Sequence, residues 1–165
     1  MKVTRRRFEL TDADAYWALI QDPEVAGPAG LSHSRQEDPK QLMYRLYQDP
    51  QEFALVRDDQ VIGQLGIYQR EVDPTATSRE VGFLLARPYW GQGIMTAQLE
   101  QVFDELKASG ITSVWAGVFL DNTRSIHLLE RLGFHYQTTV SLPAGLQAGQ
   151  PQALGYYQKD LRNEN

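Results

Sequence analysis

Two glycines separated by a single residue, Gly91 and Gly93, lie between a short apolar run and a helical pattern. A glycine has no Cβ, so the backbone can turn sharply there and a ligand can approach it closely. Apolar residues then recur at helical spacing, which predicts an amphipathic helix beginning near Gly91. The first N–H groups of such a helix lack internal partners and lie at the positive end of its dipole. The pattern therefore predicts a cradle for a phosphate or diphosphate.

Two better-known phosphate loops do not match this stretch. A Walker loop ends in Gly-Lys-Ser/Thr, and no lysine follows Gly93. A dinucleotide fingerprint requires a third glycine three residues after the second, where this chain has Thr96. An alternative without any ligand also remains, in which the glycines only allow the helix to pack closely on a sheet.

Glu80 is the second residue that could do chemistry. It opens a short apolar run, residues 80–85, that reads as a strand, and an acid within such a strand is unusual. Strand alternation places Glu80, Gly82 and Leu84 on one face. The alternative is a surface glutamate at a strand end, paired with Arg79 or another arginine.

Composition narrows the classes of protein. With 165 residues, 42% hydrophobic and 22% charged, one domain over residues 1–165 is expected. The net charge of −5 argues against a nucleic-acid binder. No apolar run approaches the ~20 residues of a membrane span, and residues 1–7 lack the apolar core of a signal peptide. Without cysteine, and with three histidines at no metal-ligand spacing, neither disulfide nor metal is expected, and a cytoplasmic protein fits best.

The elements that must position these residues follow from periodicity and turn signals. The predicted order is strand, two helices, three strands, helix, strand, helix and two strands. Helices are expected to begin at Thr11 as a cap, to run from Asp38 or Pro39 to Gln48, to start near Gly91 with Lys107 in the last turn, and to begin at the cap Asn122. The segments 25–34 and 143–151 read as loops. Strands are expected at 2–8, 52–57, 61–69, 80–85, 111–120, 134–140 and 153–161.

The stretch 90–97 resembles the coenzyme-A loop of the GNAT N-acetyltransferase superfamily, whose pattern is Gln/Arg-x-x-Gly-x-Gly/Ala. On that pattern Trp90 takes the first place, Gly93 the central glycine and Met95 the last small residue. A tryptophan in the first place resembles the RimJ/RimL-like branch. The arginine-rich start of the chain, the segment from Asn122 to Phe134 and the closing 155–157 segment also resemble that branch.

The resemblance implies an α+β fold with α/β/α layers. Its mixed, mostly antiparallel central sheet would have about seven strands, with helices on both faces. It also implies an acetyl-CoA-dependent N-acetyltransferase, which moves an acetyl group to a primary amine by direct attack on the thioester. The amine would belong to a protein N-terminus or to a small amine or amino acid. No nucleic-acid or membrane partner is expected, and a homodimer through the last strand is compatible with the sequence.

The resemblance also implies roles for individual residues. Glu80 would face the acceptor amine as the catalytic base, and Asn122 would reach the coenzyme arm while capping its helix. The backbone of the central strand would bind the pantetheine arm, and the loop would bind the diphosphate. The implied coenzyme-binding residues are Phe83, Leu84, Leu85, Trp90, Gly91, Gln92, Gly93, Ile94, Met95, Thr96 and Asn122.

The proton donor to the departing thiolate does not carry over from the family. Leu129 stands where the family usually has a tyrosine. Ser125 is the alternative, because members resembling RimL place a serine there, although a serine in a first helical turn can also satisfy a backbone group. Tyr136 and His127 are weaker candidates.

Two other classes of function stay open from the sequence. The first class is a non-catalytic acyl-CoA-binding or regulatory module on the same fold, which stays open because Met95 and Leu129 depart from the family pattern. The second is a scaffold domain that binds no coenzyme.

Overall fold

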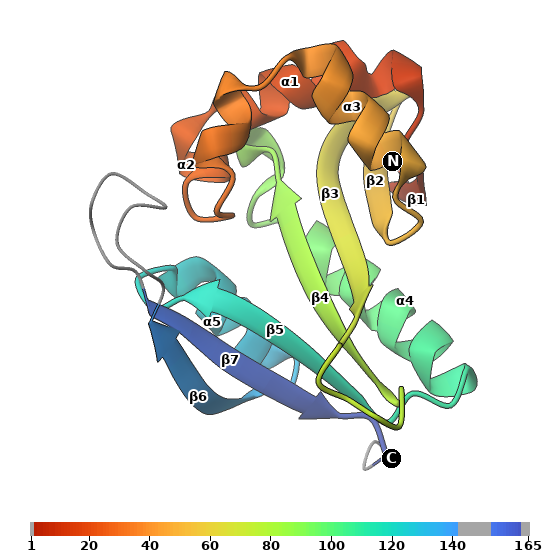
Figure 1. Cartoon of the computed structure of the whole chain (residues 1–165), viewed down its shortest axis with the longest axis vertical. Helices are drawn as coiled ribbons and strands as arrows, with labels where there is room; N and C mark the ends of the chain where they lie inside the picture. The colour runs from red at the N-terminus through yellow and green to blue at the C-terminus, as the bar shows by residue number, and fades with distance from the viewer. Residues whose placement is uncertain (1, 142–152, 163–165) are drawn as a thin grey trace. The chain divides into compact units, whose positions relative to one another are not determined.

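The structure is a computed structural model that describes residues 2–141 and 153–162 (Figure 1). Seven strands form one sheet in the order β1-β2-β3-β4-β5-β7-β6, and the mostly antiparallel α+β fold is confirmed. Only β4 and β5 run parallel among the pairs β1–β2, β2–β3, β4–β5, β5–β7 and β6–β7. The strands are β1 (Thr4–Arg7), β2 (Glu52–Arg57), β3 (Gln60–Gln69), β4 (Ser78–Leu85), β5 (Ser113–Phe119), β6 (His135–Ser141) and β7 (Ala153–Asp160).

Five α-helices and three short 3₁₀ turns accompany the strands. The helices are α1 (Ala13–Gln21), α2 (Pro23–Ala26), α3 (Pro39–Gln48), α4 (Ile94–Ala108) and α5 (Thr123–Arg131), and the turns are η1 (Leu10–Asp12), η2 (Ser32–Gln36) and η3 (Arg87–Tyr89). The described chain divides into two compact units. The first comprises residues 2–66 and 83–94, and the second comprises 67–82, 95–141 and 153–162.

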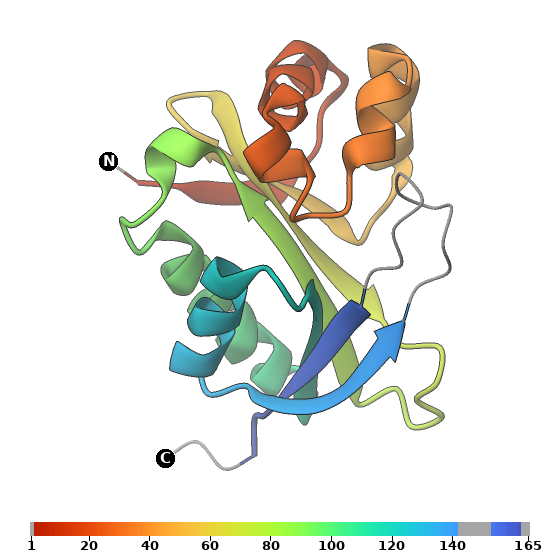
Figure 2. The same ribbon diagram turned by 90° about the vertical axis from the view of Figure 1, so that its left-hand side faces the viewer.

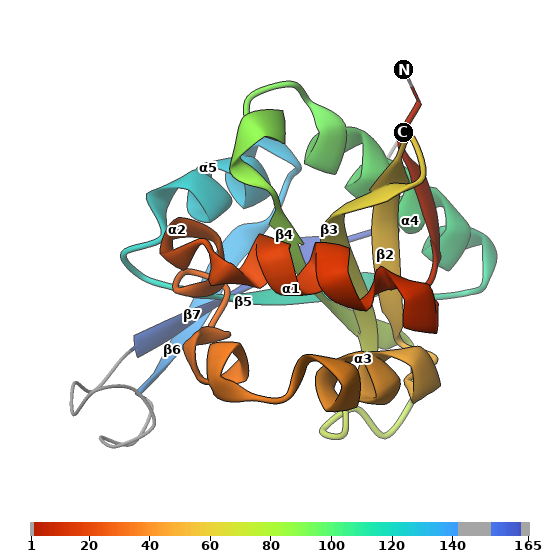
Figure 3. The ribbon, with the colours of Figure 1, turned by 90° about the horizontal axis from the view of Figure 1, so that it is seen from above.

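In the first unit, α1 and α3 lie side by side (Figure 3). Asp38 caps α3 by accepting hydrogen bonds from the N–H groups of Lys40 and Gln41, as the acid before Pro39 predicts. The apolar faces of both helices are buried together with the strands that follow. The core of this unit includes Phe8, Tyr16, Leu19, Ile20, Leu42, Met43, Leu46, Ala54, Val56, Val61 and Leu84.

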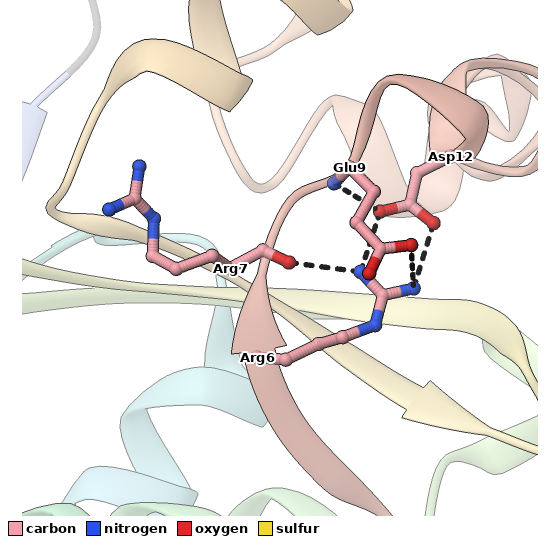
Figure 4. Close-up of polar contacts among 4 residues, drawn as sticks. All are labelled: Arg6, Arg7, Glu9 and Asp12. Atoms are coloured by element: carbon pink, nitrogen blue, oxygen red, sulfur yellow. Dashed lines mark hydrogen bonds and ion pairs between the residues drawn. The ribbon is translucent and has the colours of Figure 1, made fainter.

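The start of α1 corrects the expected cap. Thr11 lies inside η1, and Asp12, 5% exposed, stands at the N-cap position of α1 without a side-chain capping hydrogen bond. Its carboxylate instead accepts a hydrogen bond from the Glu9 N–H, in the capping box of η1, and two from the Arg6 guanidinium (Figure 4). A carboxylate held by a bidentate arginine is a stronger acceptor than a hydroxyl. Burial raises the pKa of Asp12, but the hydrogen bonds from Arg6 and Glu9 outweigh it, and the net shift is downward.

The expected loop over residues 25–34 is partly helical, which corrects a second prediction. Pro23 opens the short helix α2, and the carboxylate of Asp22 accepts a hydrogen bond from the Glu24 N–H. The pair Asp22-Pro23 ends α1 and begins α2, because an acid followed by proline is also a favourable helix start. The η2 turn then covers Ser32 to Gln36.

In the second unit, α4 and α5 lie on the same face of the strands (Figures 1 and 2). Burial alternates along β5 accordingly, with Val114 and Ala116 at most 1% exposed and Trp115 and Gly117 only half-buried. The Phe103 ring of α4 lies 5.7 Å from the ring of Phe134, which follows α5. The less buried face of β4, β5 and β7 is therefore the one opposite α4 and α5.

The last strand of the chain is not at an edge. β7 pairs with β5 on one side and with β6 on the other, so the terminal strand in this order is β6. Within the described residues both sides of the last strand are therefore paired inside the chain, and the possible homodimer stays a prediction. The loop predicted over residues 143–151 lies outside the described residues. Within the described part of the chain, no helix is long and apolar enough to cross a membrane.

Candidate functional site

The parallel ladder between β4 and β5 is short. It joins Ser78–Glu80 to residues 113–115 and ends at the pair Glu80–Trp115. β4 nevertheless continues to Leu85 as a strand. Within the described residues of the second unit, the ladder does not continue to Val81 and Gly82. The backbone groups of Val81 and Gly82 are therefore not used by this ladder.

The end of β4 is held within the first unit. The Ala86 N–H donates to the Ile62 carbonyl at 2.7 Å, and the Trp90 indole N–H donates to the Leu85 carbonyl at 2.7 Å. Leu84 and Leu85 are buried, and Phe83 is half-buried. The side chains of the predicted pantetheine-binding residues thus pack inward, and the Leu85 carbonyl already has a partner.

The glycine turn has the backbone that its sequence predicts. Gly91 and Gly93 both have φ of +74°, in the left-handed region that favours glycine. A Cβ built on either one meets nothing within 4 Å, so close packing is not what requires these glycines. The helix begins at Ile94 and not near Gly91, because a residue with positive φ cannot belong to a right-handed helix.

The residues after the turn leave the loop surface clear. Met95, which departs from the family pattern, is 7% exposed and therefore points into the core. Ile94 and Thr96 are half-buried, and Gln92 is exposed and donates from its side chain to the Pro88 carbonyl at 3.0 Å. The four N–H groups that open α4 consequently follow directly on an exposed turn.

An ion pair fixes the approach to this loop in the first unit. Arg87 of η3 donates to both carboxylate oxygens of Asp22, at 3.0 and 2.5 Å, and lies 3.8 Å from Glu24. The hydrogen bonds from Arg87 lower the pKa of Asp22. The same carboxylate caps α2, so η3 and α2 share one anchoring residue.

Glu80 lies in the second unit and is half-buried. Burial raises the pKa of its carboxyl group, and the charge of Arg70 offsets part of that rise. Arg79 is not its partner, because that guanidinium donates to the carbonyls of Ala76 and Ser78. A carboxylate with a raised pKa is a better proton acceptor near neutral pH than an ordinary surface glutamate.

Three residues that the sequence did not single out surround Glu80. Arg70 lies over the ring of Trp115, 3.9 Å from its centroid. The Tyr156 ring covers Gly117, where an added Cβ would come within 2.9 Å of it. Burial raises the pKa of Tyr156 most, and the negative charge of Glu80 raises it further. Period-2 alternation in β7 could have indicated the face of Tyr156, but no local pattern links Arg70 to Trp115.

The second predicted catalytic residue, Ser125, lies in the first turn of α5. Asn122 caps this helix by accepting a hydrogen bond from the Ser125 N–H at 3.2 Å, as predicted. Leu129, where the family usually has a tyrosine, is completely buried and cannot supply a proton. No hydrogen bond joins Glu80 and Ser125 within the described residues, so the two predicted catalytic side chains are not directly linked.

Of the other candidates, His127 is exposed and Tyr136 is engaged by Thr139 at 2.6 Å. Among residues 2–141 and 153–162, no group of three His, Asp or Glu side chains is arranged to hold a metal ion.

Comparisons with known proteins point to one family. The model of the acetyltransferase (GNAT) domain matches residues 2–135. The chain is 29% identical to the uncharacterised N-acetyltransferase p20 of Bacillus licheniformis, over 81% of this chain and 79% of that protein. It is 25% identical to the ribosomal protein bS18-alanine N-acetyltransferase of Escherichia coli K12, over 79% of this chain and 80% of the enzyme.

A solved structure gives the same fold. The structure of yncA from Salmonella typhimurium with its cofactor acetyl-CoA has a TM-score of 0.75 and 19% sequence identity, and the match covers 100% of this chain and 97% of that one. At this identity the similarity concerns the fold alone.

Proposed function

The chain belongs to the GNAT acetyltransferase family, and from this premise we propose that it transfers the acetyl group of acetyl-CoA to a primary amine at the residues described above. The observation that carries the proposal is the turn at Gly91 and Gly93. Both residues have positive φ and open surroundings, and α4 begins directly afterwards. The family model spans residues of both compact units, which supports one acetyltransferase domain.

The diphosphate of the coenzyme would bind the N–H groups at the start of α4. These groups lack partners within the helix and lie at its positive end, which favours an anion. The glycine turn lets the oxygens approach the backbone, and Met95 does not obstruct them because its side chain is buried. The hydrogen bond from the Trp90 indole N–H to the Leu85 carbonyl anchors the loop to the end of β4.

The pantetheine arm would lie along β4 beyond the end of the β5 ladder. An extended, amide-containing arm can bind an open strand edge in the way an added strand does. Backbone N–H groups of Phe83 and Leu84 would serve this role, and one of them would also donate to the thioester oxygen as negative charge grows on it.

Glu80 would act as the base. An ammonium group cannot attack, so Glu80 takes one proton from it, directly or through water. The neutral nitrogen then forms a bond to the acetyl carbon, and the carbon–sulfur bond breaks after the tetrahedral intermediate. The second amine proton leaves to water, and the thiolate accepts one proton from water, with Ser125 as its proposed hydrogen-bond partner.

The nature of the acceptor is less constrained than the reaction. The Escherichia coli relative is named for the alanine of a ribosomal protein, which supports a protein N-terminus, whereas the family resemblance equally supports a small amine or amino acid. A relative that acts on a ribosomal protein also favours a cytoplasmic location. We propose neither a nucleic-acid nor a membrane partner.

Amine-dependent release of free thiol from acetyl-CoA tests the proposal. Turnover with at least one class of primary amine is expected. Tight binding of acetyl-CoA without turnover of any amine would instead favour a non-catalytic acyl-CoA-binding module.

A further inference from the structure

Arg70 has an unusual position for an arginine at the end of a strand. It directly follows β3, and its guanidinium lies 3.9 Å from the centroid of the Trp115 ring. An arginine over an indole keeps its N–H groups at the rim, where they can still donate. The side chain is thereby held in one place and retains the fork that matches a carboxylate.

The loop that carries Arg70 is braced. The Asp73 N–H donates to the Arg70 carbonyl at 3.1 Å. The Asp73 carboxylate accepts hydrogen bonds from the backbone and hydroxyl groups of both Thr75 and Ser78. These hydrogen bonds, those from the side chain of Ser78 first, lower the pKa of Asp73, so the carboxylate stays ionised well below neutral pH. Arg70 therefore projects from a fixed loop.

Arg70 and Glu80 lie next to each other on the same face. Trp115, beneath the guanidinium, is the register partner of Glu80 in the neighbouring strand. Register partners in adjacent strands carry their side chains on the same face of the sheet, so the guanidinium over Trp115 lies on the face that carries Glu80. The electrostatic influence of Arg70 on the pKa of Glu80 agrees with this proximity.

Aromatic rings flank the two charges. The Tyr68 ring covers Gly82, where an added Cβ would lie 3.4 Å from it, and the Tyr156 ring covers Gly117. Tyrosine rings supply apolar contact for the carbon atoms of a small ligand and a hydroxyl at the rim. The arrangement complements a ligand that carries an amine and an acid close together.

We propose that Arg70 is a specificity determinant that binds a carboxylate lying next to the primary amine of the acceptor. This inference rests on the proposed function, because it assigns the amine to Glu80 and the acid to Arg70. Such a carboxylate is found in a free α-amino acid, and also in a peptide whose second residue is acidic. The competing role for Arg70 is that of a simple counter-charge to Glu80. That role would affect every amine alike, whereas a carboxylate-binding role affects only acidic acceptors.

The test compares acceptors that differ only in charge. Turnover is measured with a panel of L-amino acids and their carboxamides, and with dipeptides that differ by Asp or Asn in the second position. The acid-to-amide ratio of kcat/KM should fall about ten-fold or more in Arg70→Met, through a higher KM for the acid. Comparing this ratio between wild type and variant cancels the different basicity of the two amines. The two acceptor series distinguish the two sources of the carboxylate.

Control variants separate recognition from folding. Arg5 also lies over an aromatic ring, that of Phe53 at 5.4 Å, so Arg5→Met should leave the ratio unchanged. Arg70→Lys keeps the charge without the planar fork and should recover part of the preference. Thermal melts establish that each variant is folded.

The same pairs are also tested for binding, by saturation-transfer NMR in the presence of coenzyme A. An unchanged ratio in folded Arg70→Met, or equal use of acids and amides by the wild type, overturns the inference. Binding that favours the acid and depends on Arg70, without turnover of any amine, supports the inference and overturns the proposed function. Neither turnover nor acid-selective binding overturns both.

Discussion

Glu80 and Trp115 form the last register pair of the parallel ladder between β4 and β5. Before this pair β4 is paired with β5, and within the described residues of the second unit the ladder does not continue to Val81 and Gly82. The carboxylate with the raised pKa thus lies at the end of this ladder. In the proposed reaction this relationship places the base at the end of the segment that binds the thioester arm.

Replacing Glu80 by Gln should lower kcat 10²- to 10⁴-fold at neutral pH, which is the usual range for a general base. Affinity for acetyl-CoA should not change, because the loop is untouched. Steady-state rates across pH, with a coenzyme titration, provide the measurement. Glu130→Gln, at an exposed position on α5, is the matched control and should keep full activity. A Glu80→Gln enzyme with the pH–rate profile of the wild type would argue against this role.

The Glu80→Gln variant should lose activity but gain stability near neutral pH. Because burial raises the pKa of Glu80 in the folded state, folded protein binds more protons than unfolded protein between the two pKa values. The contribution of Glu80 to the free energy of unfolding therefore falls as pH rises through that window, and the fall is complete above the folded pKa. Relative to wild type, Glu80→Gln should be more stable at pH 7 than at pH 4, by urea midpoints. An equal difference at both pH values would contradict the raised pKa.

Gly93→Val should weaken acetyl-CoA binding and destabilise the fold by about 1–2 kcal/mol, the cost of a side chain in left-handed backbone. Gly93→Asn should retain more of both, because asparagine tolerates that conformation better. Gly110 gives a matched control: its φ is +88° and an added Cβ there also meets nothing within 4 Å. Gly110→Val should thus cost similar stability without changing coenzyme affinity. Equal affinity losses at both positions would mean that the glycine turn has no special role.

Trp90→Phe removes the indole N–H that bonds the Leu85 carbonyl, while it keeps most of the apolar contact. The loss should be about 1 kcal/mol of stability, together with a higher KM for acetyl-CoA, because the loop loses an anchor. Denaturant midpoints and coenzyme titrations measure the two effects. Trp17→Phe, which also packs against the core of the first unit, should change only stability. An unchanged KM in Trp90→Phe would show that this anchor does not shape the site.

Local signals predicted the glycine turn and the start of α5. The glycine turn and the cap Asn122 each depend on residues within one turn of chain, so the sequence is sufficient to indicate them. The start of α1 was missed because Arg6, six positions away, makes Asp12 and not Thr11 the anchoring residue. The hydrogen bonds between Arg6 of β1 and Asp12 before α1 join two separate elements, and no local pattern indicates them.

The face around Glu80 was only partly predictable. Alternation in β4 indicated which way Glu80 points. Spacing along the chain contains no record of the contact between Arg70 and Trp115. Met95 and Leu129, which depart from the family pattern, are both buried, a property that their apolar nature allowed but did not require.

A crystal structure with bound acetyl-CoA tests the central claim most directly. We expect the diphosphate oxygens within about 2.7–3.2 Å of the N–H groups that open α4, and the pantetheine arm along β4 from Glu80 toward Leu85. A coenzyme bound with its diphosphate away from residues 93–97, or with its arm on another strand, would contradict the proposed site.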